Sequence, residues 1–141
     1  GRAVYPAAAL VAPDQQGTVA RCVVQSGYWQ VPGLTQGVEE VQERWAFTYV
    51  GVVERAASVG AVYCSLVAIE PTAGIVSVDR KLKPTYGERL VWADGDGAGL
   101  VAHDHRGVRL TGLNCWENWM PLARSAMYAT GSQVHVAAWP G

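Results

Sequence analysis

A strand, a sharp turn and a helix follow one another toward the C-terminal end of this chain, and they constrain its fold more than any other feature. The apolar run Val108 to Leu113 predicts a strand, and Pro121 to Thr130 predicts a helix that Gly131 ends. A second strand is expected at Gln133 to Ala138. Because a strand and a helix joined by a short turn pack against each other, this order predicts an α/β fold (α+β in the broad sense) built in layers.

Short apolar or alternating runs, separated by Gly and Pro turn signals, fill much of the preceding chain. They predict strands at Ala3 to Tyr5, Ala46 to Val53, Ala61 to Glu70, Ile75 to Arg80 and Leu100 to His103. The last of these is expected to pair with Val108 to Leu113 around a turn at Asp104 to Gly107. Thr35 to Arg44 has a helical pattern, Leu82 to Gly99 has the composition of a long loop, and Ala7 to Gln30 allows no assignment.

The composition indicates one soluble domain that covers residues 1–141. Half of the residues are apolar, 16% are charged, and the formal net charge is -1. That charge provides no basic surface for nucleic acid or an anionic membrane, and no apolar run approaches the roughly 20 residues of a membrane span. Because the chain begins without Met or a signal pattern, we expect a cytoplasmic protein that lacks part of its N-terminus.

Cys115 is the candidate nucleophile. The three cysteines, Cys22, Cys64 and Cys115, form no Cys-x-x-Cys pair, which favours a reducing compartment over a disulfide framework or a structural zinc site. Cys115 follows a predicted strand and precedes a helix, so backbone N–H groups and the positive helix end would face its sulfur. Covalent attack on an electrophilic carbon needs a thiolate stabilised in this way. The alternative is an ordinary buried cysteine.

Two segments resemble the nitrilase branch of the carbon–nitrogen hydrolase superfamily. Residues 112–124, GLNCWENWMPLAR, closely resemble its nucleophile motif, and residues 80–92, RKLKPTYGERLVW, resemble its catalytic-lysine segment. The resemblance is continuous over residues 31–141 and poor over residues 1–30. It implies that this chain forms part of a four-layer α-β-β-α sandwich.

The resemblance assigns Cys115 as the nucleophile and Lys81 as the residue that stabilises the anionic intermediate and helps to lower the thiol pKa. Lys83 is the lesser candidate for that lysine. The family's general base is a glutamate at the end of an early strand, and the segment Ala3 to Ala9 resembles this strand. Ala7, however, stands at the expected glutamate position, so the base is not found.

The same resemblance implies that Glu88 is a supporting carboxylate that positions substrate and catalytic groups. From the residues alone, Glu88 could equally be a surface partner of Arg89. Trp116 and Glu117 are expected to bind substrate, although a helix-end role comes first for Glu117. Cys64 occupies a strand position where the family usually has Asn.

The resemblance implies a nitrilase, which converts a nitrile to a carboxylic acid and ammonia through covalent thioimidate and acyl intermediates, with no cofactor. The expected partner is a small nitrile or cyanide-like substrate, and a homo-oligomer, either a dimer or a spiral, is expected. An amidase of the same superfamily is one alternative. A catalytically impaired fragment, or a non-catalytic assembly protein, is the other, because Ala7 replaces the base.

Metal binding is not expected. His103, Asp104 and His105 could place ligands on one strand face, but the neighbouring Arg106 and Gly107 make a polar hairpin turn the better interpretation. His135 lies in an apolar strand and is expected to be a core histidine with satisfied hydrogen bonds.

Overall fold

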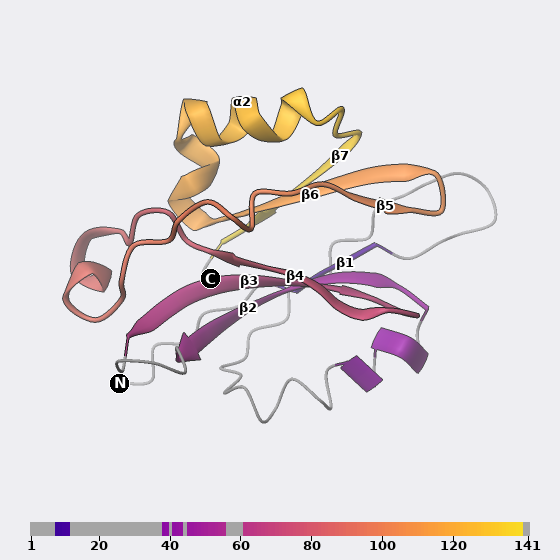
Figure 1. Ribbon diagram of the computed structural model, residues 1–141, viewed down its shortest axis with the longest axis horizontal. Helices are drawn as coiled ribbons and strands as arrows, with labels where there is room; N and C mark the ends of the chain where they lie inside the picture. Colours follow the sequence, from indigo (N-terminus) through magenta and orange to yellow (C-terminus); the bar gives the residue numbers. More distant parts are fainter. Residues whose placement is uncertain (1–7, 12–37, 40, 44, 56–60, 140–141) are drawn as a thin grey trace.

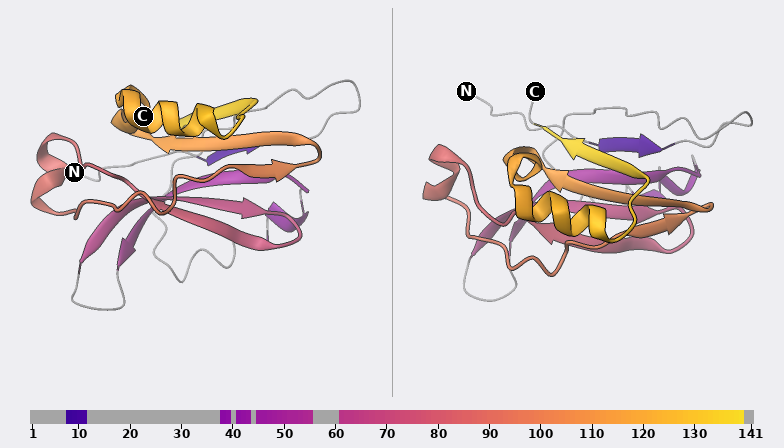
Figure 2. Two further views of the ribbon diagram at one scale, coloured as in Figure 1. Left: turned by 45° about the horizontal axis from the view of Figure 1, so that its top comes forward. Right: turned by 90° about the horizontal axis from the view of Figure 1, so that it is seen from above.

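The computed structural model describes residues 8–11, 38–39, 41–43, 45–55 and 61–139 (Figure 1). Two β-sheets lie face to face. Helix α2 (Pro121–Ala129) covers the outer side of one sheet, and the helical residues 38–39 and 41–43 lie on the outer side of the other (Figures 1 and 2). This α-β-β-α order confirms the expected fold class.

The first sheet is antiparallel, and its strands follow one another in chain order: β1 (Ala8–Val11), β2 (Phe47–Arg55), β3 (Val62–Glu70) and β4 (Gly74–Arg80). The two-residue period sends alternate side chains of β3 to opposite faces. Leu66 and Ala68 face the second sheet, whereas Val67 and Ile69 face the helical residues. Because both faces are covered, β3 is apolar from Leu66 to Ile69, which explains why its sequence run is so clear.

The second sheet has the order β5-β6-β7 and supplies the strand-turn-helix unit. β5 (His103–His105) pairs antiparallel with β6 (Val108–Asn114), and β6 pairs in parallel with β7 (Val134–Ala138). A parallel pair needs a crossover connection, which here consists of the 3-10 helix η3 (Cys115–Trp119) and α2. Gly131 ends the crossover in the left-handed conformation, with φ 81°.

Three apolar clusters fill the spaces between the four layers. The cluster between the sheets includes Phe47, Tyr49 and Leu110, and the cluster between β6 and α2 consists of Leu113, Ala123 and Met127. The third lies between the first sheet and the helical residues, and it contains Val41, Val52, Val67 and Ile69. The core is thus continuous through both sheets, and it fixes their separation.

Most elements expected in the second half of the chain are confirmed, with two corrections. The hairpin is tighter than expected, because strand β5 occupies His103–His105 and only Arg106 and Gly107 form the turn. The expected loop over residues 82–99 contains the 3-10 helix η2 (Tyr86–Leu90). In the first half, the strand expected at Ala3 to Tyr5 lies outside the described residues.

Candidate active site

The backbone turns sharply at Cys115, where β6 ends and η3 begins. Cys115 has φ 57°, a left-handed conformation that non-glycine residues rarely adopt. Its side chain is 5% exposed, and the preceding Asn114 is also buried. A residue held in a strained conformation between buried elements is typical of a functional turn, and the same geometry presents the nucleophile in other hydrolases.

Lys81 follows β4 directly and belongs to the first sheet. Its backbone N–H donates to the carbonyl of Cys64 at 2.8 Å, which extends the ladder between β3 and β4 by one residue. Its side chain is 1% exposed. An ammonium buried this completely needs a compensating partner, and this partner is Glu88, whose Oε2 lies 2.6 Å from the Nζ of Lys81. Lys81 also lies near enough to Cys115 for its positive charge to lower the pKa of the thiol.

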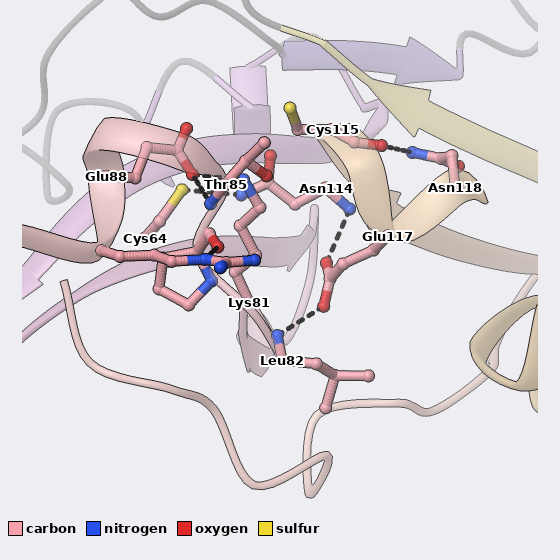
Figure 3. Close-up of polar contacts among 11 residues, drawn as sticks. Cys64, Lys81, Leu82, Thr85, Glu88, Asn114, Cys115, Glu117 and Asn118 are labelled. Carbon is pink, nitrogen blue, oxygen red and sulfur yellow. Dashed lines mark hydrogen bonds and ion pairs between the residues drawn. The ribbon is translucent and has the colours of Figure 1, made fainter. Parts of the chain in front are cut away.

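Glu88 projects from η2 toward Lys81 (Figure 3). Besides the ammonium of Lys81, its Oε2 accepts the backbone N–H of Thr85 at 2.6 Å. The turn of η2 therefore fixes the carboxylate, and the carboxylate fixes the lysine. This geometry brings together Cys115, Lys81 and Glu88. Lys83, the lesser candidate, is exposed and pairs instead with Asp94.

The pKa of the Cys115 thiol is raised above its ordinary value. Burial has the largest effect and raises it, and the negative charge of Glu88 adds to this effect. The charge and hydrogen bond of Lys81 and the backbone N–H of Trp116 lower the pKa, but by less than burial raises it. Lys81 and the helix start thus act in the expected direction without producing a thiolate. A resting thiol of this kind needs a general base before it can attack.

Glu117 is buried, with 1% of its surface exposed, and both of its carboxylate oxygens accept backbone hydrogen bonds. Oε1 accepts from Leu82 at 2.6 Å and Oε2 from Asn114 at 3.0 Å (Figure 3). The contact with Asn114 is the helix-end role expected of this residue. Both carboxylate oxygens of Glu117 are thus occupied by backbone donors, and the substrate contact also expected of this residue stays a prediction.

Comparison with known proteins identifies the family. The carbon–nitrogen hydrolase family model matches residues 13–141. This chain belongs to the carbon–nitrogen hydrolase family.

Curated relatives of this carbon–nitrogen hydrolase include enzymes named for nitriles and for cyanide. Nitrilase 2 of an unknown prokaryotic organism is 48% identical over 92 residues, which make up 64% of this chain and 29% of that protein. The arylacetonitrilase of Trametes versicolor is 37% identical over 117 residues, or 75% of this chain and 36% of that protein. The cyanide hydratase of Stereum hirsutum is 48% identical over 79 residues, or 55% of this chain and 21% of that protein. This chain thus spans 21% to 36% of the length of these relatives.

A solved structure supports the fold. The crystal structure of a carbon–nitrogen hydrolase from Helicobacter pylori G27 superimposes with a TM-score of 0.67 at 21% sequence identity. The match covers 77% of this chain and 38% of that chain. At this identity, the likeness shows that the layered architecture described above is shared.

An open groove of about 390 Å³ lies beside the candidate site of this carbon–nitrogen hydrolase. Trp116 and Trp119 form one wall, with their ring centroids 5.1 Å apart. The other lining residues are Met120, Lys83, Pro84, Thr85 and Arg89. Trp116 follows Cys115, and the Thr85 N–H binds Glu88, so the groove borders the segments that carry the three candidate residues.

The remaining candidates are placed as follows. Ala7 lies outside the described residues. His103, Asp104 and His105 have separate partners, namely Ser77, Arg109 and Glu70, and no cluster of metal-binding side chains occurs in the described part of the chain. Across the same residues, no helix is long and apolar enough to cross a membrane.

Both ring nitrogens of His135 have hydrogen-bond partners, as expected, but the side chain is half-buried and lies outside the apolar clusters. Its Nδ1 lies 3.0 Å from the hydroxyl of Thr111, and its Nε2 lies 2.9 Å from Oδ1 of Asn118. Asn118 in turn donates to the carbonyls of Leu113 and Cys115, each at 3.0 Å. His135 therefore supports the turn that carries the nucleophile.

Sequence analysis missed two contacts that shape the site. Cys64 was singled out only as a departure from the family's Asn, yet its sulfur accepts a hydrogen bond from Asn114 Nδ2 at 3.0 Å. The contact between Glu117 and Leu82 joins residues 35 positions apart. A single sequence carries no signal for such a contact, because spacing along the chain does not report distances between two sheets.

Proposed function

We propose that this chain carries the nucleophile of a nitrilase-type hydrolase. The reaction is R–C≡N + 2 H2O → R–COOH + NH3, through a covalent bond between substrate carbon and the Cys115 sulfur. The observation that supports it best is the convergence of three side chains: buried Cys115 at the start of η3, buried Lys81 directly after β4, and partly buried Glu88 of η2, which is paired with Lys81.

The proposed chemistry begins with attack of the Cys115 sulfur on the nitrile carbon. The new S–C bond forms as one C–N π bond breaks, and the proton that leaves the thiol goes to nitrogen, giving a thioimidate. Water then adds to this carbon, and ammonia leaves to give a thioester. A second water displaces the sulfur, releases the acid and restores the thiol.

Lys81 has the charge and position to stabilise negative charge that develops on the intermediates beside the sulfur. Its buried side chain is already oriented by Glu88 at 2.6 Å, so little rearrangement is needed during the reaction. Glu88 thus has the supporting role that the resemblance implies. The proton acceptor for the thiol is a separate requirement, because the thiol pKa is raised.

A panel of nitriles, with the matching amides alongside, tests the proposal through ammonia release. Cys115→Ala should lower the rate of nitrile hydrolysis by at least roughly 10⁴-fold. Lys81→Met should lower kcat by about 10²- to 10³-fold. Lys83→Met tests the lesser candidate: kcat should change less than about threefold, since Lys83 is exposed and pairs with Asp94, whereas KM is free to change because Lys83 lines the groove. Hydrolysis of amides alone would reassign the protein as an amidase of the same family. Full activity in Cys115→Ala would show that Cys115 is not the nucleophile.

A non-catalytic member of the family is the second candidate, and Ala7 favours it because the base is expected at that position. Ala7→Glu should raise nitrile hydrolysis by about 10²-fold or more if a carboxylate there serves as the base. The control is Ala9→Glu, two residues further along. Equal rates in the parent and Ala7→Glu proteins would show that the base lies elsewhere.

The substrate class follows from the groove and from the names of the relatives. Two tryptophan rings and Met120 offer an apolar wall beside the nucleophile, which suits an aryl or alkyl group on the nitrile. In this proposal Trp116 contacts the substrate. Assembly as a dimer or spiral and a cytoplasmic location stay predictions, which light scattering of the purified protein and cell fractionation would check.

A further inference from the structure

Glu117 makes the same kind of contact with both segments that carry the proposed catalytic pair. Its Oε1 accepts the backbone N–H of Leu82, the residue after Lys81, and its Oε2 accepts the N–H of Asn114, the residue before Cys115. We infer that Glu117 is a positioning residue that holds the Lys81 ammonium beside the Cys115 sulfur. This inference rests on the proposed function, in which these two groups act together.

The two contacts join different sheets. Lys81 and Leu82 follow β4 of the first sheet, whereas Asn114 ends β6 of the second sheet. Without this bridge, the spacing of the two groups would depend on side-chain packing between the sheets and on the weaker hydrogen bond from Asn114 Nδ2 to the Cys64 sulfur at 3.0 Å. The carboxylate group of Glu117 replaces this loose constraint with two directed hydrogen bonds of 2.6 and 3.0 Å.

A local capping role accounts for only one of these contacts. Capping of η3 requires the N–H of Asn114, three residues before Glu117. It does not require Leu82, which is 35 residues away along the chain. Glu88 provides the comparison within this protein, because it caps η2 through Thr85 in the same way and uses the same oxygen for Lys81. In both short helices, the capping glutamate also holds part of the site.

Burial makes the bridge rigid. Glu117 is 1% exposed, and none of the described cationic side chains forms an ion pair with it. The two backbone N–H groups are therefore its main compensation for the loss of water, and a displacement of either segment would leave a buried oxygen unpaired. Lys81 adds a favourable charge from nearby.

The bridge needs a carboxylate specifically. A glutamine at this position has one acceptor oxygen and one NH2 donor, so its NH2 would face one of the two N–H donors. Glu117→Gln therefore keeps the size of the side chain and breaks one half of the bridge. An aspartate keeps both acceptors but is one methylene shorter, so it cannot reach both donors at once.

The test compares Glu117→Gln and Glu117→Asp with Glu70→Gln in the full chain. Glu70 is a matched control, because its Oε2 also accepts two backbone N–H groups, from Thr72 at 2.6 Å and Ala73 at 2.7 Å. It caps the turn between β3 and β4, outside the site. All three substitutions should lower the midpoint of urea unfolding, so stability alone does not distinguish the roles.

Two readouts do distinguish them. The first is the pKa of Cys115, from the pH dependence of its carbamidomethylation by iodoacetamide, with the alkylated residue identified by mass. The second is the separate measurement of kcat and KM for the hydrolysis of a nitrile. If Glu117 positions Lys81, both Glu117 variants should raise the thiol pKa by about one unit or more, and lower kcat by about 10- to 100-fold with KM within about threefold. Glu70→Gln should change neither.

The inference is overturned if Glu117→Asp or Glu117→Gln loses stability but keeps the parent thiol pKa and kcat. If Glu117→Gln does not fold, Glu117→Asp provides the test of the inference. Hydrogen exchange in the parent protein provides a second test, because the amides of Leu82 and Asn114 should be protected to a similar degree. If the parent does not hydrolyse nitriles, the proposed function fails, and the thiol pKa still tests the positioning role by itself.

Discussion

Asp79 is the buried carboxyl for which the structure provides the least compensation. It is 3% exposed, and neither of its oxygens has a hydrogen-bond partner in the described part of the chain. Burial, with smaller effects from the charges of Glu117 and Asp96, raises its pKa to about 8. Asp79 is therefore protonated at neutral pH in the folded protein.

Asp79 should make stability fall as the pH rises. Between its unfolded pKa of 3.8 and its folded pKa of about 8, the folded chain binds a proton that the unfolded chain does not. The unfolding free energy then decreases by about 1.4 kcal/mol per pH unit from this group, and levels off above the folded value. Asp79→Asn removes the ionisation, so its advantage over the parent should grow from pH 5 to pH 8.

Urea unfolding midpoints of the two proteins at pH 5, 6, 7 and 8 measure this difference. Comparing the proteins at each pH cancels the contribution of other titrating groups. A constant difference between Asp79→Asn and the parent across this range would show that Asp79 is already ionised at pH 5.

At the scale of elements, close packing between the sheets fixes where β6 lies. Gly112 in β6 faces Tyr49 in β2, and a Cβ atom at this glycine would lie 2.8 Å from the Tyr49 ring. Tyr49 is itself buried, so it has little room to move. The strand that leads to Cys115 therefore approaches the first sheet as closely as backbone and ring allow.

Gly112→Ala should push β6 away from the first sheet and destabilise the protein by about 1 to 3 kcal/mol. Gly87→Ala is the matched control, since nothing lies within 4 Å of a Cβ atom at that position of η2. It should be neutral or slightly stabilising. Thermal unfolding measures both changes, and equal melting temperatures for the two variants would contradict the packing argument.

At the scale of the whole molecule, sequence analysis predicted most of the second half of the fold. The strands β3, β6 and β7 and the helix α2 have clear apolar runs or periodicity, because each packs against a neighbouring layer. β4 shows its alternation although Ile75, Val76 and Val78 are exposed. The helices η2 and η3 escaped prediction, since five residues are too few to show a period. The expected turn was longer than the observed turn at Arg106 and Gly107. The polar side chains of His103 and His105 gave no apolar pattern that would indicate a strand, although both residues belong to β5.

The site was predictable only in part. The nucleophile, the lysine and the supporting glutamate came from motif resemblance, and Cys115, Lys81 and Glu88 do lie together. The raised thiol pKa was not foreseen, because it depends on burial, which a local motif does not report. The bridging contact of Glu117 depends on how two sheets dock, and this too is absent from either motif.

The division of the proposed catalytic pair between two sheets has a consequence for how the protein loses activity. Lys81 directly follows β4 of the first sheet, and Cys115 directly follows β6 of the second sheet. Neither sheet alone contains both groups, so no partly folded state with the sheets apart can be an active one. A core substitution at Phe47, which is far along the chain from Cys115 and packs between the two sheets, should therefore act on the reaction rate through the spacing of the sheets. Heat inactivation should begin with separation of the two layers, before either sheet unravels.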